Sequence, residues 1–249
     1  MTLRQEIVDH ITEATARLES AYFRAPLVGF ASAADPRFAQ LKQIVGEHHL
    51  LPTDILPEAK TAVAFFLPFA PEVVNSNRGE QVSRLWAETY LAANAAIDAI
   101  SDDLVRMLAS REIPAAGVAA THTYDPVSLT ASWSHRSVAF IAGLGRFGLN
   151  RMLITPLGCA GRYGSVLIDA VVTPDAPADD RKEKEPCSWF REGSCGFCIA
   201  NCPTKALSET GIDRHRCNDH LLKISEGFSD LGLCDVCGKC AVGPCAMLT

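Results

Sequence analysis

Cysteine placement is the feature that most constrains this chain. Nine of its ten cysteines fall in the last 63 residues, as Cys187-x7-Cys195-x2-Cys198-x3-Cys202-Pro203, then Cys217, then Cys234-x2-Cys237-x2-Cys240-x4-Cys245. A 4Fe-4S cluster needs four thiolates around one small metal core, and a tight Cys-x2-Cys turn delivers two of them from one loop. A cysteine before proline is typical of two-cluster ferredoxins. The spacing therefore predicts two 4Fe-4S clusters.

Two other uses of these cysteines are less favoured. Structural zinc takes four ligands in two well-separated pairs, whereas each run here carries extra cysteines and Cys202-Pro203 has the ferredoxin pattern. A disulfide framework needs a higher cysteine content than ten in 249 residues. The amino-terminal segment has no apolar signal core. We expect a protein of the reducing cytoplasm.

Composition limits the partners of the chain. A hydrophobic content of 48% over 249 residues supplies one large core. The longest nearly apolar stretch, 62–71, is about half the length that a membrane-spanning helix requires. The formal net charge of −6 does not favour a broad phosphate-binding surface. We expect neither a membrane nor a nucleic acid as partner.

Helical periodicity and short apolar runs alternate over the first 172 residues. Helices are expected over 3–21, from 35, over 81–111 and over 135–142, and strands over 27–31, 62–67, 117–121 and 165–172. This order predicts an α+β fold, with helices layered on a sheet as an α/β sandwich. A stretch rich in Pro, Asp, Lys and Glu at 173–186 predicts a linker between domains 1–172 and 187–249. The second domain is too small for an apolar core alone, so its folding is expected to depend on cluster binding.

Several residues outside the cysteine runs are candidates for chemistry. His135 titrates near neutral pH and is a candidate proton donor; the alternative is a helix-start histidine satisfied by the backbone. Tyr124 is a second proton-donor candidate, against a half-buried structural tyrosine. We expect the pair His48-His49 to lie in a solvated loop. Cys159 is either a small apolar residue or a reactive thiol.

A glycine-rich segment forms the middle of the chain. Gly143, Gly145 and Gly148 match Gly-x-Gly-x-x-Gly, yet a helix is expected before them where a dinucleotide-binding fold requires a strand. The guanidinium groups of Arg136 and Arg162 can bind amide oxygens or an anion in a planar fork, and ion pairs are the alternative.

Together these segments resemble a known family. The residues that carry the resemblance are Ala142-Gly143-Leu144-Gly145, Leu153-Ile154-Thr155-Pro156, Arg162 with Ser165 to Asp169, and the two cysteine runs. They are similar to the epoxyqueuosine reductase and reductive dehalogenase group of cobalamin-dependent iron–sulfur reductases, and most to its short 4Fe-4S members. The resemblance implies a nitroreductase-like first domain that holds a corrinoid and a ferredoxin-like second domain with two 4Fe-4S clusters. The corrinoid residues that it implies are Arg136, Gly143, Leu144, Gly145, Asn150, Thr155 and Arg162.

The resemblance also implies a ligand allocation. One cluster would be held by Cys187, Cys195, Cys198 and Cys245, and the other by Cys202, Cys217, Cys237 and Cys240. A plain ferredoxin register would instead use Cys202 with Cys234, Cys237 and Cys240, which leaves Cys217 free. Both registers stay open at this point.

The implied function is an iron–sulfur oxidoreductase that passes electrons through two clusters to a corrinoid or a substrate in the first domain. An electron carrier or reductive activator for a partner corrinoid protein is the alternative, and an iron–sulfur protein without turnover is a third. A low-potential donor of the ferredoxin or flavodoxin type is the expected partner. The chain has Leu129-Thr130-Ala131 where the family's epoxyqueuosine reductases carry a catalytic Asp, and it stops four residues after Cys245. Both departures argue against a tRNA substrate.

Overall fold

The computed structural model describes residues 1–18, 21–120, 124–178 and 181–248. The chain forms two compact units, which are described separately here. The first unit comprises Met1–Leu67, Asn94–Leu144 and Arg162–Ala178, and the second comprises Pro68–Ala93, Gly145–Gly161 and Asp179–Thr249. The expected linker over 173–186 includes residues 179 and 180, which lie outside the described part, and it stays a prediction.

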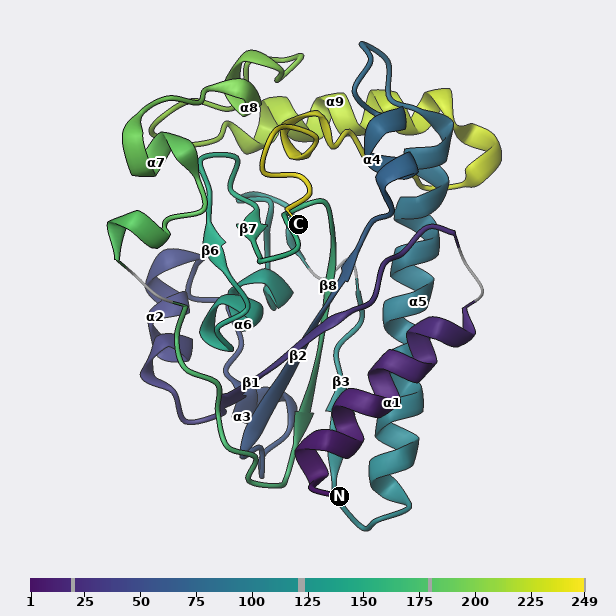
Figure 1. Ribbon diagram of the computed structural model, residues 1–249, viewed down its shortest axis with the longest axis vertical. Helices are drawn as coiled ribbons and strands as arrows, with labels where there is room; N and C mark the ends of the chain where they lie inside the picture. The colour runs from purple at the N-terminus through teal and green to yellow at the C-terminus, as the bar shows by residue number, and fades with distance from the viewer. Residues whose placement is uncertain (19–20, 121–123, 179–180, 249) are drawn as a thin grey trace. The chain divides into compact units, whose positions relative to one another are not determined.

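A four-stranded sheet, in the order β1-β2-β8-β3, is the centre of the first unit (Figure 1). Its strands are β1 (Leu27–Ser32), β2 (Thr61–Pro68), β8 (Gly161–Ile168) and β3 (Ala115–Gly117). β1 runs antiparallel to β2 with Leu27 opposite Phe66, and β3 runs antiparallel to β8 with Ala115 opposite Ile168. Every residue of β2 is buried, as its unbroken apolar run predicts for a central strand.

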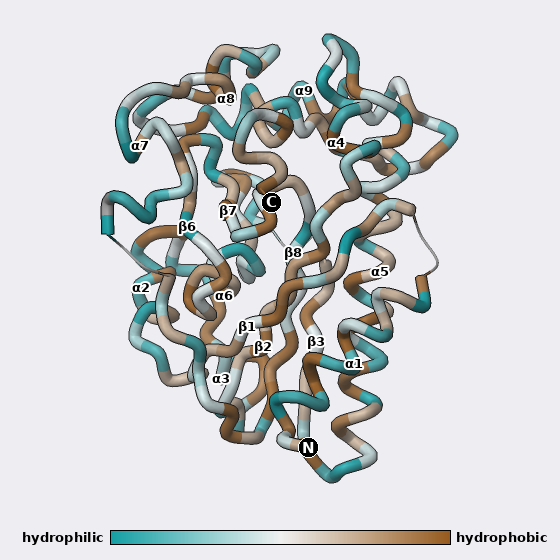
Figure 2. The backbone as a smooth tube through the Cα atoms, in the orientation of Figure 1, coloured by the Kyte–Doolittle hydropathy of each residue, from teal (hydrophilic) through white to brown (hydrophobic). Residues whose placement is uncertain are grey.

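Helices α1 (Leu3–Arg17) and α5 (Arg84–Ala109) cover one face of this sheet (Figures 1 and 2). Alternate strand residues such as Phe65 and Val166 point to this face, because side chains along a strand alternate sides. They form one apolar core with Ile7 and Ile11 of α1 and with Leu104 of α5.

The opposite face carries α2 (Pro36–Ile44), α3 (Pro52–Ile55) and α6 (His135–Ile141). Asp35 caps α2 by accepting the Arg37 N–H, and Ser134 caps α6 by accepting the Ser137 N–H. α6 contacts both α2 and β1. A two-stranded ribbon, β4 (Tyr124–Asp125) with β5 (Thr130–Ala131), precedes α6.

The position of His49 differs from the expectation that the pair His48-His49 lies in a solvated loop. Its side chain is fully buried rather than solvated, while His48 is exposed. Its Nδ1 donates to Leu50 O at 2.8 Å, and its Nε2 accepts the Ser134 N–H at 3.2 Å. The ring stacks on Trp133, and burial lowers the pKa of His49, so the imidazole is a neutral core group.

The second unit consists of short elements. It contains α4 (Pro71–Ser76), the first turns of α5, the ribbon β6 (Arg146–Phe147) with β7 (Leu153–Ile154), and helices α7 (Ser188–Glu192), α8 (Phe197–Ala200) and α9 (Arg214–Gly227). Three 3-10 turns span Lys182–Lys184, Ser229–Leu231 and Lys239–Ala241.

The mixed α/β class is confirmed, and element boundaries differ by a few residues. The first helix ends at Arg17, and residues 19 and 20 of the expected range lie outside the described part. Strand β3 lies at Ala115–Gly117, whereas the sequence predicts a strand over 117–121, of which residue 121 is not described. The last strand starts at Gly161, earlier than expected. α6 does precede the glycine-rich segment. In the described part, every helix is too short or too polar to cross a lipid bilayer.

Candidate metal centre

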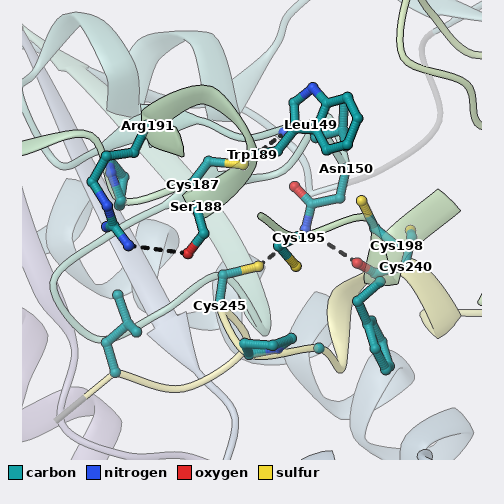
Figure 3. Close-up of a pocket in the computed structure, with 15 residues that line it drawn as sticks. Leu149, Asn150, Cys187, Ser188, Trp189, Arg191, Cys195, Cys198, Cys240 and Cys245 are labelled. Atoms are coloured by element: carbon teal, nitrogen blue, oxygen red, sulfur yellow. Dashed lines mark hydrogen bonds between the residues drawn. The ribbon is translucent and has the colours of Figure 1, made fainter. Parts of the chain in front are cut away.

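Five cysteines surround one cavity of about 200 Å³ in the second unit (Figure 3). Cys187 lies at the start of α7, Cys195 in the loop before α8, Cys198 on α8, and Cys240 and Cys245 in the closing segment. The remaining wall is largely apolar and includes Leu149, Trp189, Phe197 and Leu248. A cavity of this kind brings soft thiolate donors together within a largely apolar wall, which suits iron–sulfur ligation.

Cys187 is held through its backbone N–H and through its sulfur atom. Its N–H donates to Glu185 Oε1 at 3.0 Å, and Glu185 Oε2 pairs with Arg146 Nε at 3.0 Å. The Leu149 N–H lies 3.5 Å from Cys187 Sγ, in the geometry of an N–H donor to sulfur. Glu185 falls in the segment that the sequence marks as a linker, and only its position two residues before a cysteine hinted at this role.

Cys245 is held by a short backbone pairing with the segment 158–160. Cys159 N–H donates to Cys245 O at 3.0 Å, and Ala160 N–H donates to Ala246 O at 3.0 Å. Gly158 has a φ of +98°, and a Cβ built on it would lie closer than 3.0 Å to the Ala246 backbone. Only glycine allows this approach without strain.

We therefore expect Gly158→Ala to displace Cys245. The methyl group meets main-chain atoms, which cannot move aside as a flexible side chain can. On the prediction of two 4Fe-4S clusters, the variant should lose about four of eight iron atoms, which an iron assay on anaerobically purified protein measures. Gly193→Ala is a matched control, since Gly193 also has positive φ but open space around its Cα. Equal iron loss in both variants would contradict this role of Gly158.

The thiols near the cavity influence one another. Burial raises the pKa of Cys198 to about 11, and the nearby charges of Cys245 and Cys187 add to the shift. In the described residues, no three His, Cys, Asp or Glu side chains lie close enough to hold a single ion. The four thiolates of a 4Fe-4S cluster instead bind four different irons. Metal binding would release the protons that burial keeps on these thiols.

A second group of cysteines interacts in the same way. Burial raises the pKa of Cys240 to about 12, followed by the charges of Cys237, Cys217 and Cys202 and then by that of Cys198, which lines the first cavity together with Cys240. Burial also raises the pKa values of Cys217 and Cys237, and Cys202 adds to both shifts. Burial alone would raise the pKa of Cys202, but the backbone N–H of Leu207 and the hydroxyl of Thr204 lower that pKa below its usual value. These four sulfurs thus lie within electrostatic reach of one another.

Cys234 lies apart from this second group. Its side chain is fully buried, and its Sγ faces Ala87 O at 3.7 Å. Burial and then the Asp235 charge raise its pKa, without a contribution from another cysteine. These pKa contributions group Cys217, and not Cys234, with Cys202, Cys237 and Cys240, and the choice between the two ligand registers stays a prediction.

Lys239 makes buried hydrogen bonds that the sequence did not predict. It lies between Cys237 and Cys240 and is only 3% exposed. Its Nζ donates to Gly79 O at 2.7 Å and to Gln81 O at 2.6 Å, and also to both Asn77 O and Asn77 Oδ1. A buried ammonium with four oxygen acceptors is fully satisfied, and it fastens the loop 77–81 to the cysteine segment.

The proposed proton donors belong to the first unit. Trp133 Nε1–H donates to Ser165 Oγ at 2.9 Å, so the Ser165 hydroxyl hydrogen is free to donate to His135 Nδ1 at 2.8 Å. His135 Nε2–H then donates to Ala119 O at 3.1 Å. Burial lowers the pKa of His135, which favours the neutral ring. Both nitrogens are thus used by the fold, and a catalytic role of His135 stays a prediction, as does that of Tyr124, which is 51% exposed.

The predicted corrinoid residues fall into both units. Arg136, Gly143, Leu144 and Arg162 belong to the first unit, and Gly145, Asn150 and Thr155 belong to the second. Several already serve the fold itself. Thr155 Oγ1 donates to Gly158 O at 2.8 Å, and a Cβ on Gly145 would lie closer than 3.0 Å to the Ile154 backbone. The corrinoid assignment rests on the sequence resemblance and stays a prediction.

Comparisons with known proteins agree with that resemblance. No protein-family model matches the chain. It is 27% identical over 227 residues to an epoxyqueuosine reductase of Bacillus cereus, covering 81% of this chain and 53% of that protein. It is 32% identical over 107 residues to an epoxyqueuosine reductase of Aliivibrio fischeri, covering 42% and 26%. The chain thus spans about half the length of the Bacillus relatives that it matches.

Solved structures show the same fold. Epoxyqueuosine reductase from Bacillus subtilis matches 96% of this chain and 65% of its own with a TM-score of 0.57 at 20% identity. The enzyme from Streptococcus thermophilus matches 98% and 66%, with a TM-score of 0.58 at 17% identity. A catabolic reductive dehalogenase matches 77% of this chain and 26% of its own, with a TM-score of 0.53 at 15% identity.

Fold and site together define a class: a mixed α/β chain with the fold shared by these reductases, and with a cysteine-lined cavity in its second unit. Within that class, the chain is similar in sequence to epoxyqueuosine reductases, and it shares its fold with solved epoxyqueuosine reductases and with a reductive dehalogenase.

Proposed function

We propose that this chain is an iron–sulfur oxidoreductase that carries two 4Fe-4S clusters. The first is ligated by Cys187, Cys195, Cys198 and Cys245, and the second by Cys202, Cys217, Cys237 and Cys240. The observation that carries the proposal is the cavity of the second unit, which all four ligands of the first cluster line. Mutual pKa effects among the four ligands of the second cluster support that group as well.

A buried indole N–H supports an additional hydrogen-bond acceptor, such as a cluster sulfur, beside the second group of cysteines. Trp86 is 4% exposed, and its Nε1–H finds no hydrogen-bond partner among the described residues. The same ring edge packs against Gly238, next to Cys237, so closely that no Cβ would fit there. A buried N–H without a partner costs about 1–3 kcal/mol. Cluster and cysteinyl sulfurs are acceptors that such a donor suits.

Bound clusters would supply one-electron transfer at a potential set by their surroundings. The chain's own residues hold the thiolates, line the cavity with largely apolar side chains and donate hydrogen bonds to sulfur. The electron acceptor is proposed to be a corrinoid or a directly bound substrate, following the resemblance. The electron donor is proposed to be a low-potential protein of the ferredoxin or flavodoxin type.

Metal counts and a cobalamin titration test this function. Protein purified without oxygen is expected to contain about eight irons and about eight sulfides per chain. Added cobalamin is expected to bind, as a change in its visible spectrum. Eight irons without cobalamin binding would remove the corrinoid and leave the alternative, an electron carrier or activator for a partner corrinoid protein. Colourless protein, or protein with zinc in place of iron, would overturn the cluster proposal itself.

A tRNA is the second candidate substrate. The curated relatives are named epoxyqueuosine reductases, and one similar structure, at 21% identity and a TM-score of 0.54, is of such an enzyme with a modified tRNA stem loop. The net charge of −6 and the Leu129-Thr130-Ala131 sequence speak against RNA. Binding of a tRNA stem loop, measured at two salt concentrations, decides whether a tRNA is the substrate. Binding that weakens as the salt concentration rises would favour the tRNA.

A further inference from the structure

The side-chain amide of Asn150 faces two sulfur atoms, that of Cys159 and that of Cys245, a proposed ligand of the first cluster. Asn150 lies between β6 and β7 and is 4% exposed. Its Nδ2 is 3.8 Å from Cys245 Sγ and donates to Cys240 O at 3.1 Å (Figure 3). The same Nδ2 is 3.4 Å from Cys159 Sγ. Its Oδ1 accepts the Met152 N–H at 3.1 Å. That bond fixes which end of the amide is oxygen, so the NH₂ group must face the sulfurs.

Cys159 provides a second donor at the same ligand. It is fully buried, and its Sγ lies 3.8 Å from Cys245 Sγ. A thiolate that ligates iron carries no proton, so a Cys245 sulfur bound to a cluster can only accept, and the Cys159 S–H would be the donor in this contact. Its backbone pairing with Cys245 holds the thiol in this position.

Hydrogen bonds to a ligating sulfur change the reduction potential of a cluster. Reduction adds negative charge that is partly carried by the sulfurs, and a donor stabilises the reduced form more than the oxidised form. The cavity around Cys245 is largely apolar, so each donor there acts with little competition from water.

We propose that Asn150 and Cys159 form a donor pair at Cys245 that raises the reduction potential of the first cluster. They are positioning residues and not ligands. This inference rests on the proposed function, because it requires a cluster bound through Cys245. It also gives Asn150 a role that differs from corrinoid binding.

The test is a redox titration of the full chain, purified without oxygen and monitored by electron paramagnetic resonance. In Asn150→Leu, iron is expected to stay at about eight atoms, while one of the two midpoint potentials falls. At a fixed potential the reduced-to-oxidised ratio of that cluster should drop about tenfold, or about 59 mV for one electron. Cys159→Ala, a mild change in a buried site, should lower the same midpoint by less.

Asn201→Leu is the matched control. Asn201 is an asparagine of the same unit that donates to Lys239 O at 2.7 Å, a backbone carbonyl, and its loss should leave the first cluster's midpoint unchanged. Unchanged midpoints in both Asn150→Leu and Cys159→Ala would overturn the inference, as would an equal shift of both clusters.

Iron content separates this inference from the proposed function. Loss of iron in Cys159→Ala would overturn the inference by making Cys159 a ligand. If only the Asn150→Leu variant loses iron, the midpoint potential of the Cys159→Ala variant tests the inference. A lower midpoint of the first cluster would support it, and an unchanged midpoint would overturn it. Wild-type protein without iron would instead refute the proposed function itself.

Discussion

Replacing Cys217 with alanine is expected to lower the iron content from about eight to about four atoms per chain, and replacing Cys234 is expected to leave it at about eight. Cys217 lies within electrostatic reach of Cys202 and Cys237, and each acts on its pKa. Cys234 faces the Ala87 carbonyl and is influenced by no other cysteine. The two variants change the same atom type in the same unit, so each is the control of the other.

Iron and sulfide assays on anaerobically purified variants measure this difference, and the electron paramagnetic resonance signal of the remaining cluster shows which one persists. The plain ferredoxin register gives the reverse pattern, in which only the Cys234 variant loses a cluster. That result would move Cys217 out of the ligand set and would contradict the arrangement of the second group.

Lys239→Met is expected to have the second-largest effect. The substitution keeps most of the apolar stem but removes the ammonium, and the oxygens of Asn77, Gly79 and Gln81 lose their common donor. Unsatisfied acceptors cost about 1–3 kcal/mol each when buried, and partial hydration of this loop together with the absence of a buried charge offsets part of that sum. We expect a net loss of about 2–4 kcal/mol in unfolding free energy.

Thermal unfolding under anaerobic conditions measures the loss, and limited trypsin digestion locates it, because the exposed Arg78 lies in the released loop. Lys205→Met is the matched control: Lys205 Nζ makes one exposed bond to Ala200 O at 3.2 Å. Its loss should cost less than about 0.5 kcal/mol. Equal unfolding temperatures for the two variants would show that Lys239 does not hold the loop.

Much of the fold was predictable because its signals are local. The unbroken apolar run of β2, the Asp35-Pro36 start of α2 and the apolar stripe of α5 each depend on neighbouring residues, and each element was found near its expected place. Strand ends were less predictable, since β3 and β8 end where the pairing with a neighbouring strand ends. His49 was misjudged because its burial comes from Trp133 and Ser134, which are remote in sequence.

The sequence by itself determined where the cysteines gather and predicted iron–sulfur chemistry there, because the spacing of cysteines within a loop limits which metal groups their thiolates can bind together. It also pointed to the same relatives that the comparisons found. Only the tertiary structure decided which distant groups meet at those thiolates. Three contacts illustrate this, because each joins residues that lie apart in the chain or carry no motif. Glu185 accepts the N–H of Cys187, and Lys239 binds the loop 77–81. Asn150 and Cys159 contact the sulfur of Cys245. Such contacts depend on how the backbone is packed, and a hydrogen bond exists only where that packing brings donor and acceptor within reach.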